Sequence, residues 1–317
     1  LGVDIALYQG ETRDQILTAT LDRATGYNNM IVNGGLVRNR GVEIEANATP
    51  FRNKNGWTWR LFGTYSANEN TVMELTDDLF ALQLQNTLSG RGSMEARVGQ
   101  SMSAIYGTGY KRAPDGQIVY GEDGYPLLAN DLIYLGDSNP KGKGSFGTEI
   151  KYKGISLNIL FDGQFGGKGY SFTNAMLMEH GKHEKTLPGR YNGIIGNGVI
   201  ENPDGTYRKN DVVANEIWTY YTRHSGRENL EGSMFNTDFL KLRELTLSYS
   251  FPARICKKIG MRKLSIGVYG RDLFMITNWP AFDPEFGTLN NGAIDKGFEI
   301  AQFPATRNFG VKLNIEF

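Results

Sequence analysis

Two histidines stand three residues apart in a polar stretch, where they could bind a metal ion. His180 and His183 belong to the run His-Gly-Lys-His, and residues three apart on a helix share one face. So short a motif often arises by chance. We therefore favour an ordinary polar loop and predict no metal site there.

A second candidate combines aromatic and acidic side chains after a strand-like segment. Trp279, Phe282, Asp283 and Glu285 lie close together in the sequence with two prolines among them. They could line a substrate cavity. The alternative, which we favour, is a rigid loop in which Trp279 and Phe282 pack a small core. Two carboxylates are too few for a calcium cage.

Two adjacent charged residues, Arg243 and Glu244, lie inside an alternating segment. They could form ion pairs with neighbouring strands, which contribute little where water is near. The alternation also changes phase within residues 239–245, and one extra residue in a strand would produce that change. The sequence therefore predicts a β-bulge at this point.

Groupings that would perform covalent chemistry are missing from the sequence. It contains no recognisable Ser/His/Asp arrangement, nucleophile elbow or phosphate-binding loop. The Asp-Gly pairs beginning at Asp115, Asp123 and Asp204 are typical of turns. The one cysteine, Cys256, excludes an internal disulfide and is expected to be a free surface thiol. We predict a protein that is not an enzyme and carries no cofactor.

Composition limits the class of protein further. The 317 residues include 34 Lys and Arg against 34 Asp and Glu, so the formal net charge is zero. A protein that binds nucleic acid through its phosphates is usually basic. No apolar run is long enough for a membrane-spanning helix. Glycine is abundant, at 40 residues, and aromatics make up 12%, which favours a large antiparallel β protein.

Eight segments alternate between apolar and polar residues, as half-buried strands do. Most are longer than the ~5–6 residues of an ordinary strand and approach the ~9–11 residues of a tilted membrane-spanning strand. The eight segments are residues 1–8, 41–48, 57–66, 146–152, 155–162, 244–251, 264–269 and 309–317.

The connections between these segments alternate between short and long. Long polar loops are uncommon inside a compact soluble domain but typical of the outer rim of an outer-membrane barrel. The short connections are 51–56, 153–154 and 253–263, and the long ones are 18–35, 72–143, 171–236 and 277–306. Residues 72–143 could form an extra hairpin or a loop folded into the lumen.

Aromatic residues gather at the strand ends beside the short connections. In a membrane barrel they would form a girdle at the lipid–water interface. In a soluble sandwich the same residues would pack at one end of the hydrophobic core. The residues concerned are Trp57, Trp59, Tyr152, Tyr249, Phe251 and Phe317. The chain also opens in mid-strand at Leu1, so we expect a longer polypeptide upstream.

Several motifs together resemble the SusC/RagA-type TonB-dependent outer-membrane transporters. Residues 270–285 read GRDLFMITNWPAFDPE, with Asp272 where that family usually has Asn, and residues 239–252 read FLKLRELTLSYSFP. Residues 39–45 (NRGVEIE), 186–190 (TLPGR) and 302–307 (QFPATR) add shorter matches in the same order.

The resemblance implies an all-β transmembrane barrel of 22 strands, of which residues 1–317 would supply about the last eight. The plug domain and the segment that binds TonB would lie upstream. The implied activity is import of a bulky glycan or peptide with a SusD-like surface lipoprotein, in the outer membrane of a Gram-negative bacterium of the Bacteroidetes. Arg243 and Glu244 could then contact the plug, and Phe317 resembles the C-terminal signal that the barrel-assembly machinery reads.

Two other classes of protein remain open from the sequence. One is a soluble β-sandwich that acts as an adhesin or glycan-binding module, because a sandwich also alternates along its strands. The other is a passive porin, which would need a charged constriction, and the sequence offers no such cluster.

Overall fold

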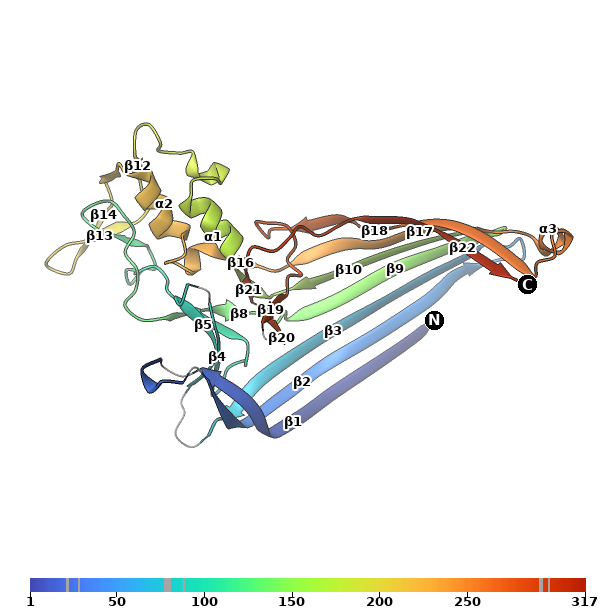
Figure 1. The fold of residues 1–317 in the computed structure, drawn as a ribbon, viewed down its shortest axis with the longest axis horizontal. Coiled ribbons are helices and arrows are strands. Elements are labelled where there is room, and N and C mark those ends of the chain that lie inside the picture. The colour runs from blue at the N-terminus through green and yellow to red at the C-terminus, as the bar shows by residue number, and fades with distance from the viewer. Residues whose placement is uncertain (21–22, 28, 77–80, 88, 291–292, 296) are drawn as a thin grey trace.

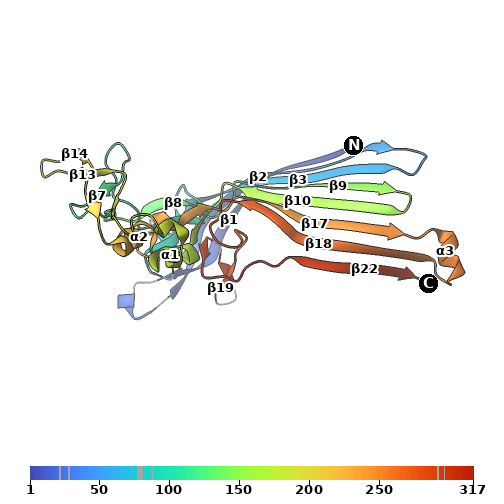
Figure 2. The ribbon, with the colours of Figure 1, turned by 90° about the horizontal axis from the view of Figure 1, so that it is seen from above.

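A computed structural model describes residues 1–20, 23–27, 29–76, 81–87, 89–290, 293–295 and 297–317. Its main feature is an antiparallel sheet of eight long strands in the order β1-β2-β3-β9-β10-β17-β18-β22 (Figures 1 and 2). The strands are β1 (Gly2–Thr20), β2 (Asn29–Arg52), β3 (Thr58–Glu74), β9 (Gly142–Tyr152), β10 (Ile155–Phe165), β17 (Phe239–Ser250), β18 (Lys263–Thr277) and β22 (Asn308–Glu316). Each coincides, to within one residue at its ends, with or extends one of the eight predicted segments, so the all-β prediction is confirmed.

The register gives the sheet two chemically different faces. One row of paired residues crosses six strands with only apolar side chains, and the next row is almost entirely polar. The apolar row is Trp59, Ile150, Leu157, Leu247, Val268 and Val311, and the polar row is Arg60, Glu149, Asn158, Thr246 and Tyr269. We call the first face the outer face and the second the inner face. On the outer face Val268 is 54% exposed and Val311 69%, so this chain leaves it uncovered.

Short connections join the strands at the end of the sheet where both termini lie (Figure 1). Trp57 and Tyr152 stack there with ring centroids 4.2 Å apart. The third connection contains a short helix, α3 (Ala253–Lys258), which the sequence analysis did not predict. Its Cys256 is fully buried, so the prediction of a surface thiol is wrong: the helix turns that side chain inward, toward the carbonyl oxygen of Phe251.

The connection predicted as a long loop at residues 18–35 is mostly strand. β1 runs to Thr20 and β2 begins at Asn29, and their ladder extends to the pair Thr20↔Asn29. The prediction of a loop there is wrong, because ladder hydrogen bonds continue past the point where apolar alternation ends. Residues 21–22 and 28 lie outside the described residues.

The other long connections fold into a cap at the opposite end of the sheet (Figure 1). Residues 72–143, which the sequence could not place, supply a four-stranded sheet in the order β4-β5-β6-β8, and residues 77–80 and 88 of this segment are outside the described part. The cap strands are β4 (Ala81–Asn86), β5 (Gly92–Arg97), β6 (Ala104–Gly107), β7 (Val119–Tyr120), β8 (Ile133–Asp137), β11 (Lys168–Ser171), β12 (Ile194–Ile195), β13 (Val199–Glu201), β14 (Tyr207–Lys209), β15 (Val213–Ala214), β16 (Met234–Asn236), β19 (Thr288–Asn290), β20 (Ala293–Asp295) and β21 (Phe298–Glu299). The helices are α1 (Phe172–Glu179) and α2 (Ile217–Ser225), with short 3-10 turns η1 (Arg23–Thr25), η2 (Glu184–Thr186) and η3 (Glu231–Ser233).

Apolar clusters give the cap a core of its own. One cluster is built from Ile105, Tyr170, Ala175, Leu230 and Phe298, all nearly inaccessible to solvent. These residues come from segments almost two hundred positions apart, so the cap is a tertiary assembly. No helix within the described residues is both long and apolar enough to cross a membrane.

A histidine stands at the centre of the cap. The ring nitrogens of His224 lie 3.1 Å from the hydroxyls of Tyr110 and Tyr120, and the Tyr110 hydroxyl also donates to the His224 carbonyl at 2.7 Å. Tyr110 has one proton to give, so it accepts from Nδ1, and Nε2 accepts from Tyr120. Burial lowers the pKa of His224 from 6.5 to about 4, which keeps the imidazole neutral.

We expect acid to weaken the cap through His224. Between pH 6.5 and pH 4 the unfolded chain binds a proton that the folded cap does not, so stability is complete above this window and falls as the pH drops through it. The loss approaches about 3 kcal/mol at the acid end. Hydrogen exchange of the cap amides across this range measures it. His224→Gln should flatten the pH dependence, whereas the exposed His180→Gln should leave it unchanged; equal profiles for all three proteins would contradict the assignment.

Candidate functional site

The inner face of β17 carries two cations next to each other. Lys241 and Arg243 lie on the inner side, although Leu245 two residues further on lies on the outer face, because the register of β17 shifts at residue 243 against both neighbours, β10 and β18. The predicted β-bulge is therefore confirmed. The bulge places the side chain of Arg243 on the inner face beside Lys241. From Leu245 onward the regular alternation returns, with Leu245 on the outer face.

Lys241 is almost completely buried and holds the segment that follows β18. Its ammonium group lies 2.7 Å from a carboxylate oxygen of Asp283 and also contacts Glu285, while its side chain is only 3% exposed. Glu285 N donates to Asp283 Oδ1 at 2.8 Å, which fixes the turn between the two acids. A buried ammonium is tolerated only with such partners.

Arg243 links three separate segments. Its guanidinium lies 2.8 Å from Asp162 on β10, 2.9 Å from Asp272 on β18 and 2.8 Å from Glu285. Asp272 has a φ of +52°, a left-handed conformation that Asp and Asn adopt more readily than other non-glycine residues. That backbone turn lies within the irregular pairing opposite Arg243. We call Lys241, Arg243 and their four acidic partners the inner-wall cluster.

Aromatic packing holds the same loop from its other side. Trp279 is 6% exposed, and its ring stacks on Phe286 with centroids 5.0 Å apart. Gly169 of β11 lies against both rings, because a β-carbon there would come within 3.1 Å of each. Phe282 is 49% exposed, so its expected place in the loop core is wrong: its φ of +58° turns the chain so that the ring stays outside.

The remaining predicted residues have local partners. Glu244 pairs with Arg271 on β18 at 3.1 Å. His180 Nδ1 lies 2.9 Å from the carbonyl oxygen of Met176, and His183 caps η2 by accepting from Lys185 N. Phe317 is 78% exposed. Among the described residues no group of three or more His, Cys, Asp or Glu side chains could hold a metal ion.

Three of the six residues of the inner-wall cluster are not predicted as site residues from the sequence. Lys241, Asp162 and Asp272 were not named as site residues, although the phase change at residues 239–245 placed Lys241 and Arg243 on one side. Nothing in the linear sequence indicates that Asp162, on another strand, meets them, because that contact depends on the register between β10 and β17.

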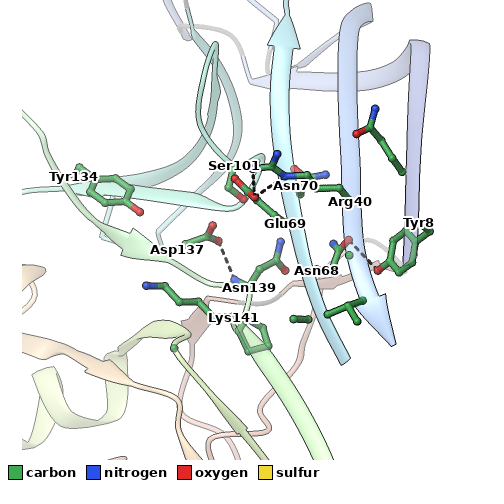
Figure 3. Close-up of a pocket in the computed structure, with 16 residues that line it drawn as sticks. Tyr8, Arg40, Asn68, Glu69, Asn70, Ser101, Tyr134, Asp137, Asn139 and Lys141 are labelled. Carbon is green, nitrogen blue, oxygen red and sulfur yellow. Dashed lines mark hydrogen bonds and ion pairs between the residues drawn. The ribbon is translucent and has the colours of Figure 1, made fainter. Parts of the chain in front are cut away.

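A cavity of about 820 Å³ lies between the cap ends of β1–β3 and the segment that leads from β8 into β9. Figure 3 places Tyr8, Asn68 and Asn70 on one side and Tyr134, Asp137, Asn139 and Lys141 on the other. The Tyr8 ring crosses Gly41, where a β-carbon would lie 2.5 Å from the phenol oxygen, and its hydroxyl donates to Asn68 at 3.1 Å.

Charges in this cavity are largely compensated. Arg40 and Glu69 form a 2.7 Å ion pair, and Asp137 accepts from Ser103 Oγ at 2.7 Å and from Asn139 N at 2.9 Å. The lining is otherwise rich in amide and phenol groups, which can both donate and accept hydrogen bonds. The sequence does not reveal this site, because its residues come from six separate segments.

Comparisons with known proteins find relatives along the whole chain, although no family model matches it. The chain is 25% identical over its full length to TonB-dependent receptor P3 of Formosa agariphila and 23% identical to TonB-dependent receptor P39 of the same organism. It spans about one third of the length of these curated relatives, 33% and 34%.

Solved structures show where this fold occurs. The chain superposes over 99% of its length on 33% of a chain in the structure of the RagAB peptide transporter, with a TM-score of 0.71 and 17% sequence identity. For the RagAB peptide importer in its open-open state the TM-score is 0.64. The two-faced sheet and its cap thus have the fold of part of that chain. Its sequence relatives are TonB-dependent receptors, to which the chain is similar along its whole length.

We expect loss of the Lys241 ammonium to release the loop at residues 278–286. Lys241→Met leaves Asp283 without its cation, and breaking a buried ion pair costs about 3 kcal/mol. Hydrogen exchange in that loop should accelerate strongly. The matched control is Lys263→Met on β18, because its pair with Glu316 is exposed, at 79% and 48%. Equal protection of the loop in both variants would show that the cluster does not hold it.

Proposed function

We propose that this chain is the C-terminal part of the barrel of a transporter that imports a bulky nutrient across the outer membrane, driven by TonB. The observation that carries the proposal is the two-faced sheet of long strands, together with full-length similarity to TonB-dependent receptors. Because the chain spans a third of those relatives, the plug, the remaining strands and the site that TonB binds belong to the rest of the polypeptide.

The outer face is proposed to contact lipid. Its apolar rows are uncovered in this chain, and its ends carry the stacked Trp57 and Tyr152 at the level where amphipathic rings prefer the membrane interface. The strand edges at β1 and β22 are unpaired among the described residues. In hydrocarbon each would need a neighbouring strand, so closure requires the rest of the barrel. Phe317 is proposed as the signal for the barrel-assembly machinery.

The inner-wall cluster is proposed as a contact between the barrel wall and the plug. It joins two cations to four carboxylates, so its inner surface has an excess of negative charge that suits a cationic group on the plug. Because Lys241 and Arg243 are already held by neighbours, the surface is preorganised before the plug arrives.

The cap is proposed to contact a SusD-like surface lipoprotein and to admit the substrate, a glycan or a peptide. Its position beyond the barrel strands (Figure 1) suits a partner outside the cell. RagAB is a peptide transporter and importer, and that description applies to that protein.

A charge on the outer face should impair membrane assembly, whereas the same charge on the inner face should not. Leu247→Arg places a cation in the apolar row at a cost on the order of 2 kcal/mol, whereas Thr246→Arg places it in the polar row. The measurement is the amount of heat-modifiable, folded full-length protein in outer membranes. Similar yields for the two variants would argue against a lipid-facing outer surface.

Transport itself is tested in cells that carry the full-length gene. We expect growth on the cognate nutrient to be lost on deletion of this gene or of TonB, and to return with the intact gene. Growth that persists without TonB would instead favour a passive porin. A chain that is monomeric and folded in buffer without detergent would favour the soluble sandwich.

A further inference from the structure

The three short connections, at the end of the sheet where both termini lie, carry only positive charge. The whole chain balances 34 Lys and Arg against 34 Asp and Glu, yet these connections hold eight of the cations and none of the acids. All eight residues are exposed. They are Arg52 and Lys54 in residues 51–56, Lys153 in residues 153–154, and Arg254, Lys257, Lys258, Arg262 and Lys263 in residues 253–263. We call these eight residues the basic edge.

The basic edge is one continuous surface, because each connection is joined to the next (Figures 1 and 2). Trp57, after the first connection, stacks on Tyr152, before the second. Ser250 N, at the end of β17, donates to Gly154 O of the second connection at 2.8 Å. Successive connections are two strands apart, about 10 Å at ~4.8 Å per strand. This spacing is comparable to the screening length of ~8 Å at physiological salt, so the fields of the cations reinforce each other.

Carboxylates of the chain compensate little of this charge. Lys263 is the one member of the basic edge with an ion-pair partner among the described residues, Glu316 at 2.7 Å. Glu149, on the neighbouring strand β9, pairs with Lys151 instead. Cations held close together without counter-charges repel each other. An anionic surface outside the chain relieves that repulsion.

Exposed apolar side chains accompany the cations and indicate what kind of surface this is. Ile255 and Ile259 are four residues apart, so they share one side of α3, and they are 46% and 52% exposed. The fully buried Cys256 holds α3 against the sheet. Just before the helix, the rings of Tyr249 and Phe251 pack edge to face with centroids 5.0 Å apart. Aromatic rings, uncovered aliphatic groups and long cationic side chains together are typical of the boundary between lipid and water.

We propose that the basic edge binds the anionic headgroups of phospholipids, such as phosphatidylglycerol, in the membrane leaflet on the side away from the cap. The phosphodiester accepts charge-assisted hydrogen bonds from Lys and Arg, while Ile255 and Ile259 enter the adjoining acyl region. The basic edge continues the outer face, whose apolar rows end at this level. Bound headgroups fix the depth of the sheet in the membrane. The inference rests on the proposed membrane location of the sheet and adds a lipid class to it.

The test uses the intact full-length transporter in neutral detergent, with short-chain lipids as probes. Native mass spectrometry gives its affinity for dioctanoyl phosphatidylglycerol and for dioctanoyl phosphatidylcholine, whose headgroup has no net charge. We expect the triple variant Arg254→Gln, Lys257→Gln, Lys258→Gln to bind phosphatidylglycerol tenfold or more weakly, because each cation beside an anionic surface contributes about fivefold. Binding of phosphatidylcholine should not change.

Two further variants separate charge from fold. Lys257→Arg with Lys258→Arg keeps both charges and should keep the affinity for phosphatidylglycerol. Lys182→Gln with Lys185→Gln and Lys209→Gln removes three exposed cations of the cap that have no ion-pair partner within the described ranges. That variant should also bind phosphatidylglycerol normally.

Equal affinity of the unaltered protein for the two lipids, or unchanged phosphatidylglycerol binding by the triple variant of α3, would overturn the inference. An acidic periplasmic protein that leaves the triple variant while lipid binding stays the same would overturn it too, because the edge would then be a protein contact. If growth remains dependent on TonB in these cases, the transport proposal stands without the lipid site. Charge-selective lipid binding by a transporter whose uptake needs no TonB would be the reverse.

Discussion

Everything in this chain depends on continuous pairing between its long strands. A strand that faces hydrocarbon has no water to satisfy its main chain, so each N–H and C=O must bond to a neighbouring strand. The ladder joins the eight strands through seven neighbouring pairs, and its register keeps the apolar side chains of consecutive strands in common rows. A shift of one residue would turn those rows to the other face. The register therefore determines both the stability of the sheet and which face is apolar.

Two departures from the ladder lie toward the cap end, and they hold polar chemistry. The bulge at Arg243 places a second cation beside Lys241, and together they draw the loop after β18 onto the inner face. β3 pairs with β9 only as far as Ser66↔Lys143, and the cavity lies beyond that point. Both sites lie toward the cap end of the sheet, where water can solvate groups that strand pairing leaves free.

The cap depends on a different principle. Its strands are short, and its cohesion comes from apolar clusters and buried polar groups that join distant segments. Glu299 is an example: it accepts from Ser171 Oγ, Thr173 N and Thr173 Oγ1 at the start of α1, at an end of the helix that favours negative charge. The final long connection is thereby fixed to the middle of the chain.

The sequence by itself determined the eight strands, their two faces and the bulge, because alternation with a period of two is a local property that the chemistry of one face imposes. It did not predict the fold of residues 72–143, the burial of Cys256 or the extension of β1 and β2. These features depend on ladder hydrogen bonds and packing and not on a local pattern. Only the tertiary structure decided that Asp162 and Asp272 meet Arg243 and that β3 has an open edge. Such contacts between distant segments are fixed by register, and no single segment records which neighbour it will face.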